Sequence, residues 1–422
     1  MKHRRAAAPK RQPPSPRLDA ATQATLDAAL EKHRLGATDE AMEGYRKVLA
    51  VAPRQLDALM NLGGALTTLG KAGEALRHLR LGLEQAPDLP RVQNDAGVCF
   101  TELGRYDEAI AAFRRAVELA PGYAVAWKNL GRVLVDVGRE AEAVPVLQQA
   151  VLIEPLLAEG WWELHRALFD PAQPRPAVEA LTRAVAADPD FPFARFLLAV
   201  TLELAGDGRA AAQQLDVLRR AGVFGGAIES WRYVKEKRSP ATRLFVSTRR
   251  ALLFALEEAK LEGLSLELGV RYGISTRWVA EAEPARTLHG FDSFQGLPEQ
   301  WHIQPAGAYS THGELPEVPP NVELHVGLFQ DTLPAFAREH EGPIRFMNVD
   351  CDLYASTKIA LDLLAGRIVP GTILVFDEYL VNDRWREDEY KAFQEAVADR
   401  GLRYEYLAFS LFTGQAVVKI IA

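Results

Sequence analysis

Carboxylate side chains follow two apolar segments in the second half of the sequence. Asp350 and Asp352 come directly after "FMNV", and Asp377 and Glu378 come directly after "ILVF". A carboxylate at the end of a buried segment is costly unless it is paired, hydrogen-bonded or bound to a cation. These residues therefore predict a polar site, suited to a metal or a cofactor amine, where the two segments end.

The one-residue spacing of Asp350 and Asp352 assigns them different tasks. Alternation would place both on one face if the strand continued, but at a strand end the two can diverge. One of the two can then turn to a bound ligand while the other caps the following helix. Asp352 could orient Tyr354 or cap the following helix, a task that Ser356 or Thr357 could also perform. The alternative, that both acids only cap helices or pair with Lys and Arg, stays open.

Strand-like and helix-like segments alternate around these acids, which predicts a Rossmann-like α/β domain with a parallel sheet. The expected strands are 263–269, 287–293, 321–327, 344–351 and 371–378, with 404–409 and 416–421 as an antiparallel end. The expected helices are 275–283, 333–340, 356–368 and 390–400. Such folds bind ligands at the carboxyl ends of their strands, and each of the five parallel strands ends in acids or glycines.

The stretch "LELGVRYGIST" restricts the kind of ligand. Gly269 and Gly273 form a glycine turn, but Arg271 stands where a dinucleotide-binding turn needs glycine near the pyrophosphate. A ligand without phosphate, such as S-adenosylmethionine, suits this turn better. Asp292, about twenty residues further on at the end of the next strand, would accept hydrogen bonds from ribose hydroxyls.

Five motifs in order carry a family resemblance: "LELGVRYGIST", "GFDSFQGLPEQW", "GLFQDTLP", "NVDCDLYASTKIAL" and "GTILVFDEY". Together they resemble the macrocin O-methyltransferase-like family of class I S-adenosylmethionine-dependent methyltransferases, over residues ~245–422. The resemblance implies that Asp292 holds the ribose and Phe329 lies near adenine. The full set of expected cofactor contacts is Glu267, Gly269, Gly273, Ser275, Asp292, Ser293, Phe329 and Asp350.

The same resemblance implies a divalent metal, usually magnesium. Its expected ligands are Asp350, Asp377 and Glu378. Glu378 stands where the best-known members have a second Asp, and it can still offer oxygen to a hard cation. The implied reaction is methyl transfer to a hydroxyl, such as that of a diol, catechol or sugar, whose pKa the metal lowers.

No general base is assigned by the sequence. His302 and His312 lie in the long loop 296–321, which also holds Trp301 and Tyr309 as possible walls of an acceptor pocket. These two histidines and Asp352 are the candidates, and an ordinary exposed loop position is the alternative for either histidine. Lys391 is a further candidate on no better grounds, because most lysines are solvated.

The first half is a repeat with a period of 34 residues. Proline recurs at that step at Pro53, Pro87, Pro121, Pro155 and Pro189, and alanine and glycine follow their own series in phase. This period is that of tetratricopeptide repeats, which are helix–turn–helix units stacked into a solenoid. We expect about six units over residues 20–221, then a junction at 222–244 and the methyltransferase-like domain at 245–422.

One position of the repeat reads Asn61, Asp95, Asn129 and Glu163 in successive units. It is either a solvated helix face or a polar ladder on the concave side that binds an extended peptide. Because the ladder becomes acidic, a basic peptide would suit it. The repeats are therefore expected to hold a peptide or protein partner.

Charge and composition limit the remaining classes. Residues 1–17 hold six Lys or Arg and no acid, so a net charge of −7 leaves −13 on the rest, which argues against nucleic acid as main partner. We interpret residues 1–19 as a disordered basic tail rather than a secretory signal. No apolar run could span a bilayer. Cys99 and Cys351 lie far apart in sequence and in different expected domains, so we expect no disulfide between them, which favours a reducing, cytoplasmic location.

The leading hypothesis is an S-adenosylmethionine-dependent methyltransferase, an O-methyltransferase, whose repeats bind a partner. The alternative is a non-catalytic tetratricopeptide scaffold with a vestigial methyltransferase fold, against which the intact Glu267, Gly269 and Asp292 argue. A nucleotide-dependent oxidoreductase on the same fold is disfavoured by Arg271. The sequence does not identify the methyl acceptor.

Overall fold

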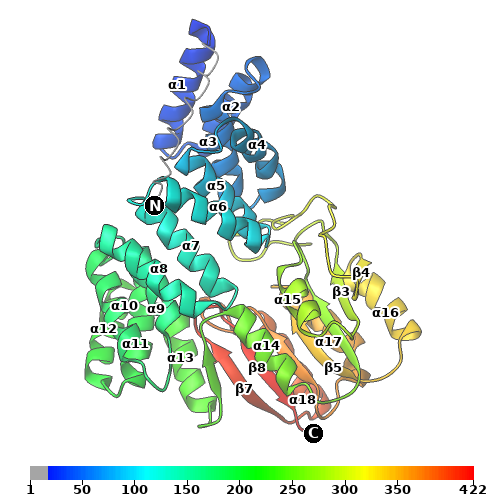
Figure 1. The fold of residues 1–422 in the computed structure, drawn as a ribbon. Coiled ribbons are helices and arrows are strands. Elements are labelled where there is room, and N and C mark those ends of the chain that lie inside the picture. Colours follow the sequence, from blue (N-terminus) through cyan, green and yellow to red (C-terminus); the bar gives the residue numbers. More distant parts are fainter. Residues whose placement is uncertain (1–17) are drawn as a thin grey trace, which may run out of the picture. The chain divides into compact units, whose positions relative to one another are not determined.

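The computed structural model describes residues 18–422 (Figure 1), so the predicted tail lies outside the described residues except for its last two. Asp19, within that predicted tail, is the N-cap of the first helix and accepts a hydrogen bond from the backbone N–H of Thr22. The chain divides into two compact units, residues 1–129 and 130–422.

The first unit consists of helix pairs that follow the 34-residue period. Its helices are α1 (Ala20–Arg34), α2 (Thr38–Val51), α3 (Leu56–Thr68), α4 (Ala72–Gln85), α5 (Pro90–Glu102), α6 (Tyr106–Leu119) and the first part of α7 (Ala124–Asp136). Pro53, Pro87 and Pro121 each follow the second helix of a pair by two residues, because proline cannot continue a helix. The predicted tetratricopeptide architecture is confirmed.

Small residues allow the two helices of a repeat to pack closely. A Cβ on Gly63 would lie 2.7 Å from the side chain of Leu79, and a Cβ on Gly97 would lie 2.6 Å from that of Phe113. Gly131 stands in the same relation to Leu147 in the second unit. These glycines and their large partners each recur every 34 residues, so one packing arrangement is repeated along the chain.

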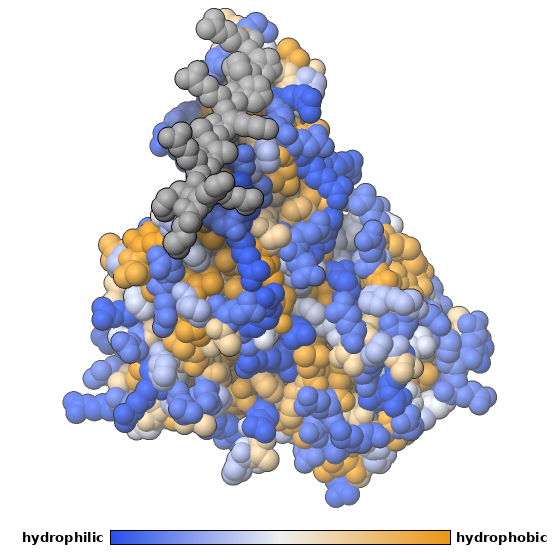
Figure 2. Space-filling model, in the orientation of Figure 1, coloured by the Kyte–Doolittle hydropathy of each residue, from blue (hydrophilic) through white to orange (hydrophobic). Residues whose placement is uncertain are grey.

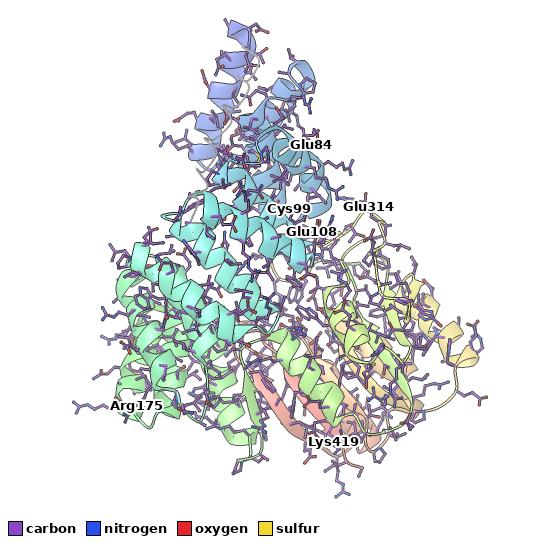
Figure 3. All side chains as sticks on the ribbon, in the orientation of Figure 1. Glu84, Cys99, Glu108, Arg175, Glu314 and Lys419 are labelled. Carbon is purple, nitrogen blue, oxygen red and sulfur yellow. The ribbon has the colours of Figure 1, made fainter. Side chains whose placement is uncertain are left out.

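The second unit continues the repeats and then forms the sheet domain. Its further helices are α8 (Glu140–Ile153), α9 (Ala158–Leu168), α10 (Arg175–Ala187, with Arg175 labelled in Figure 3), α11 (Pro192–Leu204), α12 (Gly208–Ala221) and α13 (Gly225–Lys237). The segment 222–244, predicted as a junction, is largely helix α13. Its Ile228, Trp231 and Val234 recur at helical spacing and are buried.

Eight strands form one sheet in the order β1-β7-β8-β6-β5-β2-β3-β4. Their bounds are β1 (Arg243–Phe245), β2 (Leu264–Leu268), β3 (Leu288–Asp292), β4 (Val322–Val326), β5 (Ile344–Val349), β6 (Ile373–Phe376), β7 (Tyr404–Ser410) and β8 (Ala416–Ile420). All pairings are parallel except the two that β8 makes. The α/β prediction is confirmed. Strand β1, which pairs with β7, is an additional strand that the sequence pattern does not predict.

Helices cover both faces of the sheet. They are α14 (Thr248–Glu258), α15 (Ile274–Ala282), α16 (Phe329–Glu339), α17 (Tyr354–Leu363) and α18 (Glu389–Arg400). Apolar residues of α14 and α15 pack with Ile373 and Val375 of β6. Residues of α13, α16, α17 and α18 pack on the opposite face with Leu374 and Phe376, as strand alternation requires.

Aromatic side chains join the last repeats to the sheet domain within the second unit. Phe412, in the turn between β7 and β8, stacks on His165 of α9 at 4.8 Å between ring centroids and also contacts Trp162. On α13, the hydroxyl of Tyr233 lies 2.7 Å from that of Tyr406 on β7. The repeats and the sheet therefore share one core from α9 onward.

The surface is mixed in polarity. On the face drawn in Figure 2, hydrophilic residues are interspersed with hydrophobic ones, as is usual for a folded protein. Both cysteines are free: Cys99, labelled in Figure 3, is buried on α5, and Cys351 is half-buried after β5. Among residues 18–422, no helix combines the length and apolar character that crossing a membrane requires.

Candidate active site

The carboxyl ends of five parallel strands open into one cavity of about 570 Å³. Its walls come from the segments that follow β2, β3, β4, β5 and β6, together with the loop after β3. In the sheet, β2 lies between β3 and β5. Strands β3 and β4 follow on one side of β2, and β5 and β6 follow on its other side. The cavity lies at this point, where the strand order reverses. Its volume falls in the range of small-molecule sites, roughly 300–1,000 Å³.

The glycine turn after β2 brings two strands into contact. Gly269 has a φ of +96°, and a Cβ at this position would lie 1.7 Å from the carbonyl oxygen of Asp350. Arg271, in the position where a dinucleotide turn has glycine, also takes a left-handed conformation with φ of 49°. Only glycine fits at position 269, because any Cβ there would clash with the backbone that follows β5. At position 271 the backbone is also left-handed, but it accommodates the arginine side chain.

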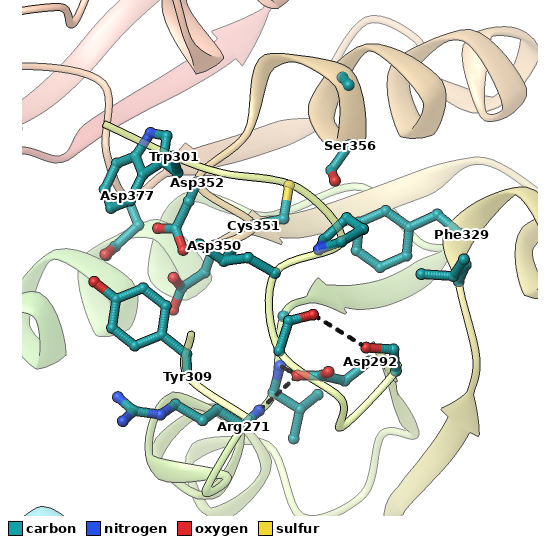
Figure 4. A pocket seen from close by; sticks show the side chains of 18 of the residues that line it. Arg271, Asp292, Trp301, Tyr309, Phe329, Asp350, Cys351, Asp352, Ser356 and Asp377 are labelled. Carbon is teal, nitrogen blue, oxygen red and sulfur yellow. Dashed lines mark hydrogen bonds between the residues drawn. The ribbon is translucent and has the colours of Figure 1, made fainter. Parts of the chain in front are cut away.

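Asp292 holds this turn in place. Its Oδ2 accepts hydrogen bonds from the backbone N–H groups of Val270 at 2.9 Å and Arg271 at 2.8 Å. Its Oδ1 accepts one from the N–H of Phe294 at 2.7 Å. Asp292 lines the cavity together with Ser293, and Figure 4 shows it on the same side as Phe329. Oδ2 already accepts two hydrogen bonds, but Oδ1 accepts one and has room for another, so Asp292 can still receive a ligand hydroxyl through Oδ1.

Glu267 lies beneath the turn rather than on the cavity wall. It is fully buried, and its Oε1 accepts a hydrogen bond from Asn348 of β5 at 3.0 Å. Burial raises the pKa of this carboxyl above its usual value, and hydrogen bonds from the side chains of Thr276, Ser275 and Asn348 oppose that rise. Glu267 is therefore held by the start of α15 and by β5, beneath the glycine turn.

Four acids gather on one side of the cavity: Asp350, Asp352, Asp377 and Glu378. Burial and the charge of Asp377 raise the pKa of Asp350 well above its usual range. The same two causes raise the pKa of Asp352 to about 7 and that of Glu378 to about 8. Burial raises the pKa of Asp377 to about 6. Carboxyl groups that oppose one another's ionisation in this way form a site that attracts a cation.

The donor set of this acidic cluster consists of oxygen atoms, which suits a hard divalent cation such as magnesium. Figure 4 shows Asp350, Asp352 and Asp377 close together beside Tyr309. Arg271 is the only Lys or Arg among the described residues that line the cavity. The single positive charge of Arg271 does not balance four carboxyl groups. The residues present therefore fit a metal ion at Asp350, Asp377 and Glu378.

The loop after β3 folds over the acidic side. Tyr309 and Trp301 both line the cavity. The guanidinium of Arg271 lies 5.0 Å from the centre of the Tyr309 ring, which is a cation–π contact. His302 Nε2 lies 2.8 Å from Asp388 Oδ2, just before α18, so this histidine fastens the loop to the sheet domain.

The structure brings most of the predicted site residues to the cavity, and some lie elsewhere. Gly269, Ser275, Asp292, Ser293, Phe329, Asp350, Asp352, Asp377 and Glu378 line it. Glu267 and Gly273 support the turn without lining the cavity. Of the three candidates for a base, His302 and His312 are not among the lining residues, and His312 is exposed. Asp352 is the candidate that faces the cavity.

Two participants were missed in the sequence. In the sequence, Arg271 serves only as an argument against a dinucleotide. In the structure its side chain lines the cavity, and its Nε has no hydrogen-bond partner among the described residues. Glu389, at the start of α18, is buried and accepts a hydrogen bond from the N–H of Glu378 at 3.0 Å. The acidic run "EDE" at 387–389 is the sequence feature that could have indicated Glu389.

A second cavity, of about 460 Å³, adjoins the first within the same unit. Phe193 of α11, Phe224 before α13 and Phe412 of the β7–β8 turn line it, together with Glu378. Glu378 lines both cavities, so this acid lies between the first cavity and the aromatic wall of the second.

Two protein-family models match the chain. Residues 4–232 match a tetratricopeptide model described as Cilia and flagella-associated protein 70 C-terminal domain, and residues 266–379 match a model described as Methyltransferase domain. The first match covers more than half of the chain. No curated protein matches the chain.

Several solved structures resemble the chain. The pilF protein of Pseudomonas aeruginosa is 23% identical, with 52% of this chain and 99% of that chain covered and a TM-score of 0.45. A thermophilic TPR protein of Thermus thermophilus is 20% identical over 43% and 98% of the two chains, with a TM-score of 0.39. MamA of Desulfovibrio magneticus RS-1 is 24% identical over 39% and 93%, with a TM-score of 0.35.

The family matches agree with the helix pairs and the parallel sheet described above. The first begins before α1 and ends within α13, and the second begins in β2 and ends three residues after β6. The second match therefore includes the glycine turn, Asp292 and the acidic cluster. The chain belongs to the family described as the Cilia and flagella-associated protein 70 C-terminal domain, and it carries a methyltransferase domain after its tetratricopeptide repeats.

Proposed function

We propose that the protein is an S-adenosylmethionine-dependent O-methyltransferase. The observation that carries the proposal is the convergence of the glycine turn, Asp292 and the acidic cluster on one cavity in a methyltransferase domain. S-adenosylmethionine supplies the methyl group when it is bound, and a hard divalent cation would lower the pKa of an acceptor hydroxyl.

Each half of the cavity suits a different part of the reaction. Asp292 and Phe329 offer a carboxylate and an aromatic ring for a ribose and an adenine. The unpaired Nε of Arg271 is suited to the carboxylate of an amino-acid end. Asp350, Asp352 and Asp377 lie across the cavity from Asp292 and Phe329, as Figure 4 shows, and an acceptor hydroxyl would be oriented beside these acids.

Asp350, Asp377 and Glu378 are the residues that would hold magnesium. Asp352 is the group best placed to take a proton from the acceptor, because it lines the cavity and belongs to the acidic cluster. Tyr309 and Trp301 cover the acids and would exclude water from the reacting groups. The second cavity, which shares Glu378, is the proposed approach for the acceptor, a small molecule or sugar that bears a hydroxyl.

The repeats are proposed to bind a peptide or protein. Part of the polar ladder is already occupied within the first unit: Arg91 donates to Asn61 at 2.8 Å and pairs with Asp95, and Asn129 donates to Asn94 at 2.8 Å. A partner would have to compete with Arg91 for Asp95. This favours a peptide with its own Arg or Lys at that place over a neutral one.

Calorimetry with S-adenosylmethionine tests the proposal. We expect the full chain to bind one equivalent, and Asp292→Ala to weaken binding at least tenfold because hydrogen bonds to a charged acceptor are lost. Asp331→Asn, an exposed acid on the first turn of α16, is the matched control and should bind like the wild type. A wild-type chain that shows no binding would favour the non-catalytic scaffold.

A further inference from the structure

Three histidines gather on one face of the sheet, away from the cavity. His289 of β3 pairs in register with Glu323 of β4, and the next pair on the same face is Phe291 with His325. Partners in a parallel ladder point to the same side, so all four side chains share one face. Their positions follow from the alternation of the two strands alone.

Helix α16 covers this face with Phe336 and, just after its last residue, His340. Phe336 and His340 are four residues apart and therefore lie on the same side of the helix. The ring centroid of His289 lies 4.8 Å from that of Phe336 and 4.6 Å from that of His340. The C-terminal end of α16 thus brings a third histidine over the β3–β4 pair.

We propose that His289, Glu323 and His340 bind a zinc ion. One ligand atom from each of the three residues lies within 4.8 Å of the other two. Among the described residues, this is the group of three His, Cys, Asp or Glu side chains that are close enough to share a metal ion. Two imidazoles and one carboxylate are a common zinc ligand set that leaves a fourth position for water. Nitrogen donors distinguish this group from the oxygen-only acids of the cavity, which suit magnesium.

The geometry needs only a small adjustment. Ligand atoms of a tetrahedral zinc site lie about 3.3 Å apart, given bonds of about 2.0–2.1 Å. Nδ1 of His289 already lies 3.4 Å from Oε2 of Glu323. Glu323 is exposed and His340 half-buried, so both can move by about an ångström, while the buried His289 stays fixed.

His325 lies beside the proposed site. Its Nε2 lies 3.2 Å from Nδ1 of His289, so in the metal-free protein either ring can donate to the other. The ring of His325 is held by stacking on Phe291, with centroids 4.4 Å apart. Zinc bound through Nδ1 of His289 would replace this hydrogen bond, because one ring nitrogen cannot serve both partners.

The charges near the group also fit a cation. Glu323 adds one negative charge, and Glu339, next to His340, adds to the field at His325. Zinc would join β4, the edge strand, to β3 and to the end of α16.

Cobalt is the probe for the site, because tetrahedral Co²⁺ with nitrogen ligands absorbs visible light strongly and Co²⁺ bound by six oxygens absorbs weakly. The full chain is titrated with Co²⁺ in excess Mg²⁺, which occupies the carboxylates of the cavity. We expect one equivalent of Co²⁺ to produce visible bands, and Zn²⁺ to remove them.

Glu323→Gln and His340→Gln should each abolish the bands or weaken Co²⁺ binding at least tenfold. His78→Gln, in the helix α4 of the repeats, is the control and should leave the bands unchanged. Because Glu323 is exposed, its variant tests the site even if the histidine variants fold poorly. Zn²⁺ should also raise the Tm of the wild type by several degrees and that of Glu323→Gln by less. Absent bands, or equal bands in all variants, would overturn the proposal.

Discussion

Replacing Gly269 by alanine should disturb the cavity without adding charge or changing polarity. The new Cβ would lie 1.7 Å from the carbonyl oxygen of Asp350. That oxygen belongs to the backbone, so no side chain can rotate away, and about 1.3 Å of displacement is needed to reach even a close contact near 3.0 Å. The variant therefore pushes the end of β5, with Asp350, away from the turn.

The expected size of the effect has two parts. Alanine at a φ of +96° costs about 1 kcal/mol of backbone strain. The displacement of packed backbone adds roughly 1–3 kcal/mol, which is typical of overpacked interiors. A shift of about 1 Å at a site can cost on the order of 100-fold, so we expect S-adenosylmethionine binding to weaken by ten- to one-hundredfold.

Gly342→Ala is the matched control. Gly342 has a similar φ of +102°, but no atom lies within 4 Å of the position that its Cβ would take. It should lose about 1 kcal/mol of stability and bind S-adenosylmethionine like the wild type. Chemical denaturation and calorimetry measure both quantities. If Gly269→Ala binds and unfolds like Gly342→Ala, the close contact between turn and β5 does not position the site.

Three further predictions test other parts of the structure. His165 is fully buried, and burial lowers its pKa to about 3, so it contributes stability that is present above about pH 6.5 and lost as the pH falls toward 3. On acidification, the Tm of His165→Phe should therefore drop less than that of the wild type. Parallel curves of Tm against pH would contradict this prediction. Asp377→Asn should weaken Mg²⁺ binding at least tenfold in calorimetry, whereas the exposed Asp362→Asn should not; equal affinities would remove the metal assignment. Tyr406→Phe should cost about 1–3 kcal/mol of unfolding free energy because two buried tyrosine hydroxyls lose their 2.7 Å partner, and a loss below about 0.5 kcal/mol would refute that network.

The repeats could be predicted from sequence because their packing is local. Each glycine or proline that sets a turn recurs at a fixed step, and the helices that pack together are neighbours along the chain. Helix α13 escaped prediction because it begins after the period ends, and its burial depends on contacts with β7 far along the chain. The short strand β1 has only three residues, too few to show an alternating pattern.

The floor of the cavity was also predictable, and its cover was not. Acids and glycines at strand ends meet because parallel strands align their carboxyl ends, so Asp292 and Asp350 could be placed from the sequence. The position of the loop after β3 depends on contacts such as that of His302 with Asp388, 86 residues away. No local pattern encodes that contact, and the sequence therefore left both histidines of the loop as candidates for a base.

A crystal structure of the full chain with S-adenosylhomocysteine would test the central claim most directly. The account predicts a nucleoside in the cavity after β2, with its ribose hydroxyls on Asp292, its adenine beside Phe329 and its sulfur facing the acidic cluster. A nucleoside bound elsewhere, or a cavity that stays closed to it at saturating concentration, would contradict the account.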